Sequence, residues 1–230
     1  MIVTIDGPAG AGKSSTARTL AKRLGFEYLD TGAMYRAVAL AGMRNGISWD
    51  DPPPEQVETI LARMQLKLDA DKIFLNDEDI SGQIRTVEVT TNSGKVAAIP
   101  AVRHQLVQWQ QEIAVGKDMV CEGRDQGTVV FPNAECKFFL IASPEARAQR
   151  RLRQLQEKGV DTDLAAVLQS QKERDERDAG RDVGPMVPAP DATVLDNSTL
   201  TQEHVLTTME QQVRRCIPSS PTTGTGSPTS

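Results

Sequence analysis

The chain has 230 residues, of which 39% are hydrophobic and 25% are charged, and its formal net charge is −5. This balance supports one or two packed domains and argues against a wholly disordered chain. The negative charge excludes a general electrostatic attraction to nucleic acid or to an anionic membrane, and an aromatic content of 4% argues against a stacking surface for single strands.

Three cysteines, Cys121, Cys136 and Cys216, are too few and too far apart in the sequence for a disulfide scaffold or a CxxC zinc site. They fit a reducing compartment. No apolar run reaches the roughly 18 residues that a membrane-spanning helix needs. Met1 leads straight into an apolar strand rather than a basic leader. We therefore expect a cytoplasmic monomer with no nucleic-acid or membrane partner.

Short β-branched runs alternate with helical stretches along the chain. Strands are predicted at residues 2–6, 26–30, 119–121, 137–142 and 193–195. Helices are predicted at residues 13–24, from about 32, from about 144 and at 201–214. This alternation predicts a parallel sheet that is covered by helices.

Local signals mark where three of these helices begin or end. Gly25 is expected to stop the first helix, because glycine readily adopts the left-handed conformation that often follows a helix. Thr31 is the expected N-cap of the second helix. Ser143, Pro144 and Glu145 combine a cap, a proline at the first helical position and an acid in the first turn, which predicts a helix start.

One segment interrupts the alternation of strands and helices. A helix is predicted at 55–64, followed by two short strands at 66–68 and 73–75, which indicates a small α+β insertion. Another segment, residues 154–182, is dense in charge and poor in apolar residues, which is typical of a mobile helical lid. The predicted organisation is a core at 1–49, 94–153 and 183–216, an insertion at 50–93, a lid at 154–182 and a disordered tail at 217–230.

Residues 7–14 read GPAGAGKS and match the pattern GxxxxGK[ST]. A strand precedes this segment and a helix follows it, which favours a nucleotide-binding P-loop over a chance glycine-rich turn. In such a loop the backbone N–H groups surround phosphate oxygens, and Lys13 reaches the β- and γ-phosphates of ATP. The expected nucleotide-binding residues are Gly7, Pro8, Ala9, Gly10, Ala11, Gly12, Lys13, Ser14 and Ser15.

Two side chains are candidates for holding Mg²⁺ with ATP. The Ser14 hydroxyl is the expected direct ligand. Glu122 follows a predicted core strand, where an acidic residue often reaches the ion through water, although a purely structural carboxylate is the alternative.

Features outside the P-loop indicate which class of P-loop protein this chain resembles. The chain lacks the NKxD pattern by which GTPases read guanine. An insertion and an arginine-rich lid indicate phosphoryl transfer to a small acceptor, because a closing lid keeps water from hydrolysing ATP. A noncatalytic nucleotide-dependent switch is the alternative from another class.

Arginines are placed where a phosphate acceptor would need them. Arg124 and Asp125 follow a predicted strand, at the edge where open parallel sheets bind ligands. Three further arginines in the predicted lid are spaced by 3 and 4 residues, so they share one helix face. This spacing favours phosphate binding over a solvated face for Arg174, Arg177 and Arg181.

One predicted helix carries four arginines, Arg147, Arg150, Arg151 and Arg153. Of these, Arg147 and Arg153 are expected on a solvated face, in ion pairs between neighbouring turns. Arg36 and Arg103 lie in other helices and are additional candidates for the acceptor site.

Seven segments resemble, in order and spacing, those of the bacterial cytidylate kinase family, the CMP and dCMP kinase branch of the nucleoside monophosphate (NMP) kinases. They are GPAGAGKSS, LDTGAMYRA, DEDISGQIRT, KVAAIPAVR, EGRDQGTVVFP, KERDERD and PAPDATVLDNS. The resemblance runs from residue 1 to about 215. It is carried most specifically by LDTGAMYRA, EGRDQGTVVFP and KERDERD, because many families share the P-loop. It implies an α/β P-loop three-layer fold with a five-stranded parallel sheet, an α+β NMP-binding insertion and a helical lid.

The resemblance also implies roles for individual residues. The cytosine would be bound by Thr31, Arg103 and Asp125, and the CMP phosphate by Arg36, Arg124 and Arg181, with Tyr35 beside them. The ribose would be bound by Arg174 and Asp178, and the transferring phosphoryl group neutralised by Arg151 and Arg177. Asp125 suits cytosine because a carboxylate accepts from the N4 amine, which uracil lacks, and it equally suits a salt bridge to arginine. Gly94 stands where the family carries a serine near the ribose.

The implied reaction is phosphorylation of CMP or dCMP by ATP, with Mg²⁺ as cofactor, to give CDP or dCDP and ADP. The acceptor phosphate attacks in line and no covalent intermediate forms. The catalytic residues would be Lys13, Arg124, Arg151, Arg177 and Arg181. The alternative is a P-loop kinase of another small acceptor, such as a different nucleoside monophosphate or shikimate.

Overall fold

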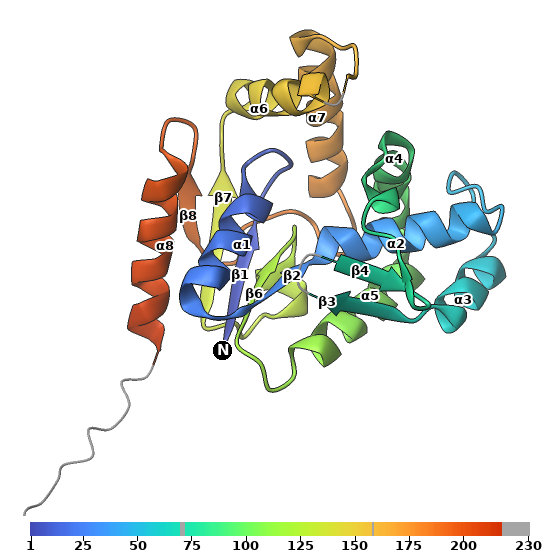
Figure 1. Ribbon diagram of the computed structural model, residues 1–230, viewed down its shortest axis with the longest axis horizontal. Helices are drawn as coiled ribbons and strands as arrows, with labels where there is room; N and C mark the ends of the chain where they lie inside the picture. The colour runs from blue at the N-terminus through green and yellow to red at the C-terminus, as the bar shows by residue number, and fades with distance from the viewer. Residues whose placement is uncertain (70–71, 158, 218–230) are drawn as a thin grey trace, which may run out of the picture.

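A computed structural model describes residues 1–69, 72–157 and 159–217 of the chain. Its centre is a five-stranded sheet in which every neighbouring pair of strands is parallel (Figure 1). The strand order is β2-β6-β1-β7-β8. These strands are β1 (Ile2–Asp6), β2 (Glu27–Asp30), β6 (Met119–Glu122), β7 (Cys136–Ile141) and β8 (Thr193–Asp196). The predicted parallel sheet and α/β class are confirmed.

Helices cover the sheet and build the remaining parts of the molecule. They are α1 (Lys13–Leu24), α2 (Thr31–Arg44), α3 (Pro54–Arg63), α4 (Val87–Val96), α5 (Pro100–Ala114), α6 (Pro144–Glu157), α7 (Leu164–Ala179) and α8 (Gln202–Cys216), with short helical segments η1 (Gln83–Arg85) and η2 (Gln126–Val130). Within the described parts of the chain, no helix has the length and apolar character of a membrane span.

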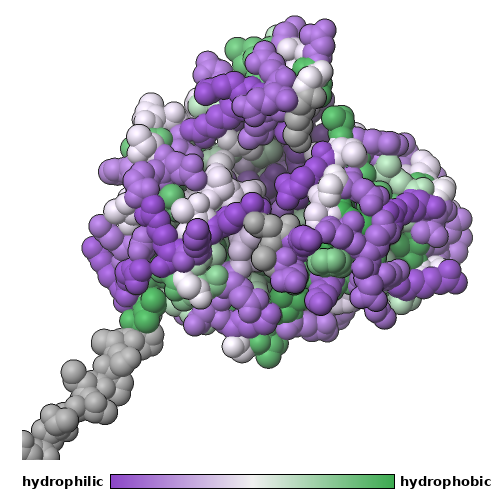
Figure 2. All heavy atoms as spheres, in the orientation of Figure 1, coloured by the Kyte–Doolittle hydropathy of each residue, from purple (hydrophilic) through white to green (hydrophobic). Residues whose placement is uncertain are grey.

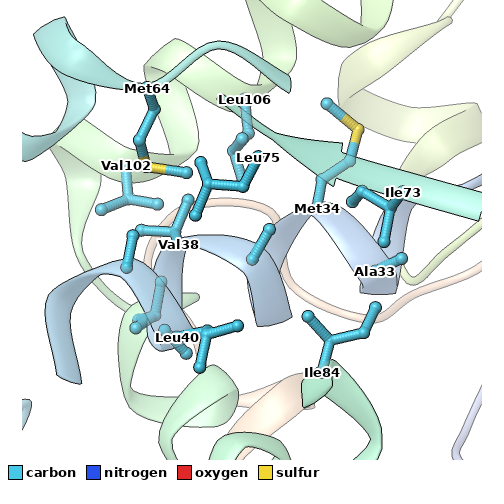
Figure 3. Close-up of a cluster of buried hydrophobic side chains, with 14 of the residues drawn as sticks. Ala33, Met34, Val38, Leu40, Met64, Ile73, Leu75, Ile84, Val102 and Leu106 are labelled. Atoms are coloured by element: carbon cyan, nitrogen blue, oxygen red, sulfur yellow. The ribbon is translucent and has the colours of Figure 1, made fainter. Parts of the chain in front are cut away.

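Two hydrophobic clusters hold the helices against the central sheet and against the insertion. The first joins the sheet to α1 and α8, and its fully buried members include Ile5, Leu20, Phe138 and Met209. The second packs α2 against α4, α5 and the insertion, with residues such as Met34, Val38, Ile73, Ile84 and Leu106 (Figure 3). Because α2 begins directly after β2, this second core ties the insertion to the central sheet.

The insertion contains a second, antiparallel sheet of β3 (Leu66–Asp69), β4 (Lys72–Leu75) and β5 (Glu78–Asp79). The predicted helix and two strands are present, whereas β5 was not predicted. Asn76 and Asp77 have φ angles of 49° and 66° and form the turn between β4 and β5. Such a two-residue turn suits the twist of a hairpin, and Asn and Asp tolerate it.

Two of the predicted domain boundaries fall inside helices, whereas those at 49/50 and 182/183 fall between elements. The boundary between residues 93 and 94 falls inside α4, and the boundary between 153 and 154 falls inside α6. The division into core, insertion and lid therefore stays a prediction. Most of the predicted tail, residues 218–230, lies outside the described residues.

The start of α2 differs from the prediction. Asp30, not Thr31, is the N-cap, and its carboxylate accepts a hydrogen bond from the Ala33 backbone N–H. Thr31 is the first helical residue, and its hydroxyl donates to the carbonyl of Glu122 at 2.7 Å. The aspartate takes the cap position because its carboxylate accepts from the helix, whereas the Thr31 hydroxyl points to the Glu122 carbonyl. The other predicted end, Gly25 after α1, has a φ of 72° and is confirmed.

Candidate active site

The P-loop joins the carboxyl end of β1, the central strand, to α1. Gly7, Gly10 and Gly12 have φ angles of 136°, 79° and 95°, which side-chain-bearing residues rarely adopt. Gly12 occupies the N-cap position, and no described side chain caps α1. The first N–H groups of α1 are therefore available for phosphate oxygens.

Lys13 is only 5% exposed, and its ammonium group donates to the Pro8 carbonyl at 2.8 Å. Burial and the neighbouring charge of Arg124 lower the pKa of Lys13 to about 7, and Arg174 contributes in the same direction. A buried lysine close to two arginines is unfavourable by itself. A bound polyphosphate would supply the missing negative charge.

The Ser14 hydroxyl donates to the Glu122 carboxylate at 2.5 Å, and the Tyr28 hydroxyl donates to the same oxygen at 3.3 Å. These oxygens lie next to the P-loop lysine and have the hard character that Mg²⁺ prefers. Among the residues that the structure describes there is no group of three or more His, Cys, Asp or Glu that could hold a metal ion. The pair therefore fits an ion that takes its remaining ligands from phosphates and water.

Arg147 is a P-loop contact that the sequence did not predict. It was expected to face solvent, but it is 6% exposed. Its guanidinium donates to the Ala9 carbonyl in the P-loop at 3.1 Å and to the Asp175 carboxylate of α7 at 2.5 Å. The expectation failed because α7 folds back over α6 and covers this face, whereas Arg153 is exposed as predicted.

Two more unpredicted residues hold the loops of the site. Asn197, directly after β8, donates to the Ala11 carbonyl in the P-loop at 2.8 Å. Asp6, the last residue of β1, accepts from the backbone N–H groups of Gln126 and Gly127 at 2.9 and 2.8 Å. Asp6 thereby fixes the segment that carries Arg124 and Asp125. An acidic residue at the end of the P-loop strand was the available signal in the sequence.

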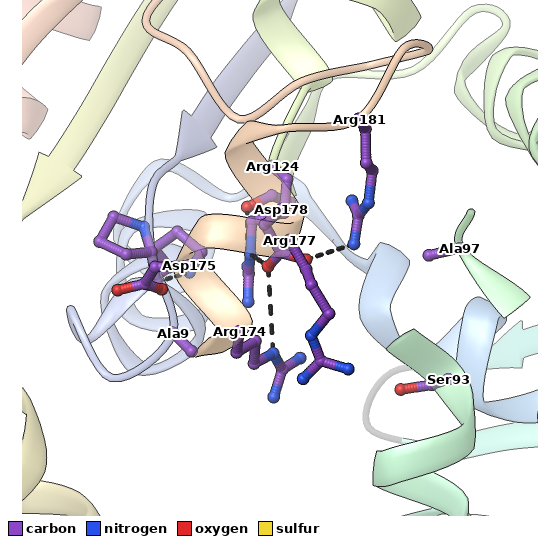
Figure 4. A network of polar contacts seen from close by, with 12 residues as sticks. Ala9, Ser93, Ala97, Arg124, Arg174, Asp175, Arg177, Asp178 and Arg181 are labelled. Atoms are coloured by element: carbon purple, nitrogen blue, oxygen red, sulfur yellow. Dashed lines mark hydrogen bonds and ion pairs between the residues drawn. The ribbon is translucent and has the colours of Figure 1, made fainter. Parts of the chain in front are cut away.

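Asp178 near the end of α7 gathers three predicted site arginines (Figure 4). Its carboxylate accepts from Arg124 Nε at 3.0 Å, pairs with Arg181, and lies 3.9 Å from Arg174 Nε. Asp178 is 3% exposed. Burial alone would raise the pKa of Asp178, but the charges of the three arginines hold it below its ordinary value. One negative charge among three positive ones leaves this cluster, the Asp178 cluster, suited to an anion.

Arg103 and Asp125 form a buried salt bridge. Arg103 Nη1 also donates to the Ala97 carbonyl at 3.3 Å, and its guanidinium lies 6.0 Å from the centre of the Tyr35 ring. Burial raises the pKa of Asp125. Gly184, after α7, lies against this pair with a φ of 63°, and a side chain there would collide with both partners. Gly184 was not predicted as part of the site.

The remaining predicted residues surround these groups. Arg36 pairs with Asp30 at 3.1 Å, and Arg151 is half-buried on α6. Arg177 is exposed and extends alongside Arg174 in Figure 4. Ser15 is exposed, and its hydroxyl donates to the Gly12 carbonyl at 2.9 Å.

The segment around Gly94 has room for a side chain. A Cβ on Gly94 would meet no described atom within 4 Å. Ser93 is buried, and its hydroxyl donates to the Thr90 carbonyl of its own helix at 2.7 Å.

Hydrophilic side chains line the recess between the arm of α6 and α7 and the part of the molecule that contains α2 and α4 (Figure 2). The arm stands over the end of the sheet from which the P-loop leaves (Figure 1). A separate cavity of about 490 Å³ lies between α2, α3 and β4. Arg44 and Glu78 in its lining pair with each other, and the cavity does not include P-loop residues.

A parallel sheet with a P-loop after its central strand, and an arginine-lined recess beside that loop, defines a P-loop phosphotransferase. A sequence model of the family described as cytidylate kinase matches residues 3–215. The chain belongs to the cytidylate kinase family.

Individual relatives agree with this assignment. The cytidylate kinase of Rhodopirellula baltica is 48% identical over 220 residues, which cover 96% of this chain and 95% of that protein. The cytidylate kinase of Actinobacillus succinogenes is 47% identical over 215 residues, covering 90% of this chain and 95% of that protein. A solved structure of an uncharacterized protein from Eubacterium ventriosum has a TM-score of 0.52 at 11% identity, covers 93% of this chain and 98% of that chain, and shows a common fold alone.

Proposed function

We propose that this chain transfers the γ-phosphoryl group of ATP to CMP or dCMP and releases ADP with CDP or dCDP. One observation carries the proposal beyond family membership. Lys13 from the P-loop, Arg124 from the segment after β6, and Arg174 from α7 are close enough for both arginine charges to lower the pKa of the lysine. Arg124 and Arg174 also lie against the same carboxylate, Asp178, and neighbouring cations from three segments are suited to a reaction between two phosphate groups.

The donor side is the P-loop. Its backbone N–H groups and the N-terminus of α1 hold the phosphates of ATP, and Lys13 neutralises the β- and γ-phosphate oxygens. Ser14 would hold Mg²⁺ directly and Glu122 would hold it through water. When bound, the ion supplies positive charge that stabilises the negative charge on the β- and γ-phosphate oxygens. Arg147 and Asn197 keep the loop in place through the carbonyls of Ala9 and Ala11.

The acceptor side is the Asp178 cluster together with the Arg103–Asp125 pair. Arg36, Arg124 and Arg181 hold the CMP phosphate, with Tyr35 beside them. Arg174 and Asp178 bind the ribose, and Thr31, Arg103 and Asp125 bind the cytosine. Burial raises the pKa of Asp125, and the charge of Arg103 opposes that rise, so the bridge favours the ionised form that accepts from the N4 amine.

The transfer itself needs no protein nucleophile. An oxygen of the CMP phosphate attacks the γ-phosphorus, and the bond from that phosphorus to the oxygen shared with the β-phosphate breaks, leaving its electrons on ADP. Lys13, Arg124, Arg151, Arg177 and Arg181 neutralise the charge that develops in the transition state. We further propose that the lid segment at 154–182 closes over the reactants and excludes water, and that the insertion at 50–93 encloses the nucleotide monophosphate.

The proposed setting follows from composition and charge. We propose that the chain acts as a monomer in the cytoplasm, without a nucleic-acid or membrane partner. Its net charge of −5 supports the absence of a nucleic-acid or anionic-membrane partner, because it provides no overall attraction to a polyanion.

The test is the initial rate of ADP release in separate reactions with CMP, dCMP, UMP, AMP and shikimate. We expect the largest kcat/KM with CMP and a lower value with UMP. The proposed acceptor is wrong if UMP, AMP or shikimate gives the largest kcat/KM. A slow release of ADP that none of the five compounds changes would indicate a noncatalytic switch.

A further inference from the structure

Cys136 and Cys216 lie side by side although they are far apart in the sequence. Cys136 is the first residue of β7 and Cys216 is the last residue of α8. Their Sγ atoms are 2.9 Å apart, and both are free thiols. The pair brings together the start of one strand and the end of the helix that packs beside it.

The cysteine pair lies at the end of the sheet opposite to the end from which the P-loop leaves. Cys136 pairs with Val3 near the start of β1, whereas the P-loop leaves from the other end of that strand. In Figure 1 both the start of β7 and the end of α8 lie at the lower end of the sheet, and the arm of α6 and α7 stands at the upper end. A reaction at this pair is therefore separate from the phosphoryl-transfer site.

We propose that Cys136 and Cys216 are an oxidation site, at which a low-molecular-weight disulfide such as oxidised glutathione converts the two thiols into an intramolecular disulfide. A disulfide bond is about 2.05 Å long, so the sulfur atoms need to approach by less than about 1 Å. Side-chain rotation supplies a movement of this size without rearrangement of β7 or α8.

The difference in exposure sets the order of the reaction. Cys216 is exposed and Cys136 is 3% exposed. Burial and the contact with Cys216 raise the pKa of Cys136 to about 12. The exposed Cys216 thiol therefore attacks the disulfide reagent first, and the buried Cys136 thiol reacts second because its partner sulfur is already beside it.

The step is a double thiol–disulfide exchange. The Cys216 thiolate attacks one sulfur of oxidised glutathione, forms a mixed disulfide and releases one glutathione thiolate. The Cys136 thiolate then attacks the Cys216 sulfur, and the second glutathione leaves as a thiolate. Two protein thiols are oxidised by two electrons in total, the reagent is reduced to two thiols, and the two protons pass to the two glutathione molecules.

The bond would join two elements of the first hydrophobic cluster. The residues are 80 positions apart, so the cross-link closes a long loop of the unfolded chain. The helix α8 packs on α1 and on β7, and its buried residues include Leu206, Met209 and Val213. We therefore expect oxidation to stabilise the protein against thermal unfolding without altering phosphoryl transfer.

The experiment treats the full chain with oxidised glutathione and then measures the intact mass, the peptide linkage and the melting temperature. We expect a loss of about 2 Da for the two hydrogens, a peptide that joins Cys136 to Cys216, and reversal by a reducing agent. The melting temperature should rise by about 4 °C or more, and kcat should stay within about twofold.

Two controls make the result specific. Cys121 is fully buried in β6 and should remain a free thiol throughout. Cys216→Ser changes an exposed side chain, should fold like the wild type, and should show neither the mass loss nor the rise in melting temperature. The proposal is overturned if both thiols of the wild type stay free, if glutathione remains attached to Cys216, or if the bond forms and the melting temperature does not rise.

Discussion

Lys13 combines a cost to the stability of the fold with a proposed role in phosphate binding. Its ammonium group is buried beside Arg124 and Arg174, and its pKa is lowered to about 7. The charged form of Lys13 therefore destabilises the folded protein until a bound anion compensates it. An apolar residue at this position would be easier to bury, so the lysine is explained by phosphate binding rather than by packing.

Replacing Lys13 should separate activity from stability. We expect Lys13→Ala to lower kcat by at least about 10²-fold, because a preorganised charge at the transition state is lost. Its melting temperature should not fall, because the buried charge is removed. Lys22→Ala, on the exposed face of the same helix, is the matched control and should keep wild-type turnover. A folded Lys13→Ala protein with near wild-type kcat would remove this residue from the mechanism.

Asp125 is in contact with Arg103, and the two possible roles of its carboxylate can be distinguished by comparing substrates. Asp125→Asn keeps the size of the side chain but adds donors. We expect kcat/KM for CMP to fall by roughly tenfold or more and the preference for CMP over UMP to narrow. Asp51→Asn, at an exposed position, is the control for the loss of one charge. An equal loss for CMP and UMP would leave only the salt bridge.

Asp178 combines a predicted contact to the ribose with an observed contact to arginines. The bonds from Arg124 and Arg181 mean that Asp178→Ala should lower kcat/KM for both CMP and dCMP. CMP should lose more by up to roughly 10- to 150-fold, because only CMP offers a 2′-hydroxyl to a charged acceptor. Measured kcat/KM values for both nucleotides decide the matter. Equal losses contradict the ribose contact, and an unchanged value for dCMP contradicts the role in positioning the arginines.

At the scale of elements, Arg147 of α6 connects α7 to the P-loop. It extends from α6 and contacts both the Ala9 carbonyl and the Asp175 carboxylate of α7. Gln171 of α7 also donates to the Arg147 carbonyl, at 3.3 Å. The packing of α6 against α7 is therefore linked by hydrogen bonds to the P-loop.

This link predicts an effect on ATP rather than on CMP. We expect Arg147→Ala to raise KM for ATP by about tenfold, the size of one lost hydrogen bond to a charged group, with a smaller change in KM for CMP. Arg147→Lys should recover part of the loss, because a lysine keeps the charge. Arg153→Ala, on the same helix but exposed, should behave like the wild type. Equal changes in both KM values would indicate general damage to the fold.

Elements with strong local signals were predicted well. The α1 helix occupies the predicted residues, because a P-loop before it and a glycine after it define both ends. The start of α6 agrees as well, with the Ser143 hydroxyl accepting from the Ala146 N–H at 3.2 Å. Features that depend on contacts between distant segments of the chain were not predicted. Asp30 rather than Thr31 caps α2, and the Thr31 hydroxyl instead donates to the carbonyl of Glu122 at the end of β6, a contact between distant segments.

At the scale of the whole molecule, the sequence indicated which residues would belong to the candidate site but not how they contact each other. Arg124 and Asp178 are 54 residues apart, and their hydrogen bond depends on how α7 packs. The burial of Arg147 and the proximity of Cys136 to Cys216 depend in the same way on tertiary packing. Residue spacing within one helix or loop carries no information about such pairs. The roles assigned to the site residues accordingly stay predictions until they are measured.

The central claim is that a phosphoryl group passes directly from ATP to CMP in a site closed to water. The most direct measurement quantifies ATP, ADP, CMP and CDP together as the wild-type chain reacts with ATP, CMP and Mg²⁺. We expect ADP and CDP in equal amounts at every time point, and almost no ADP when CMP is omitted. ADP formed at the same rate without CMP, or ADP formed without CDP, would contradict the account.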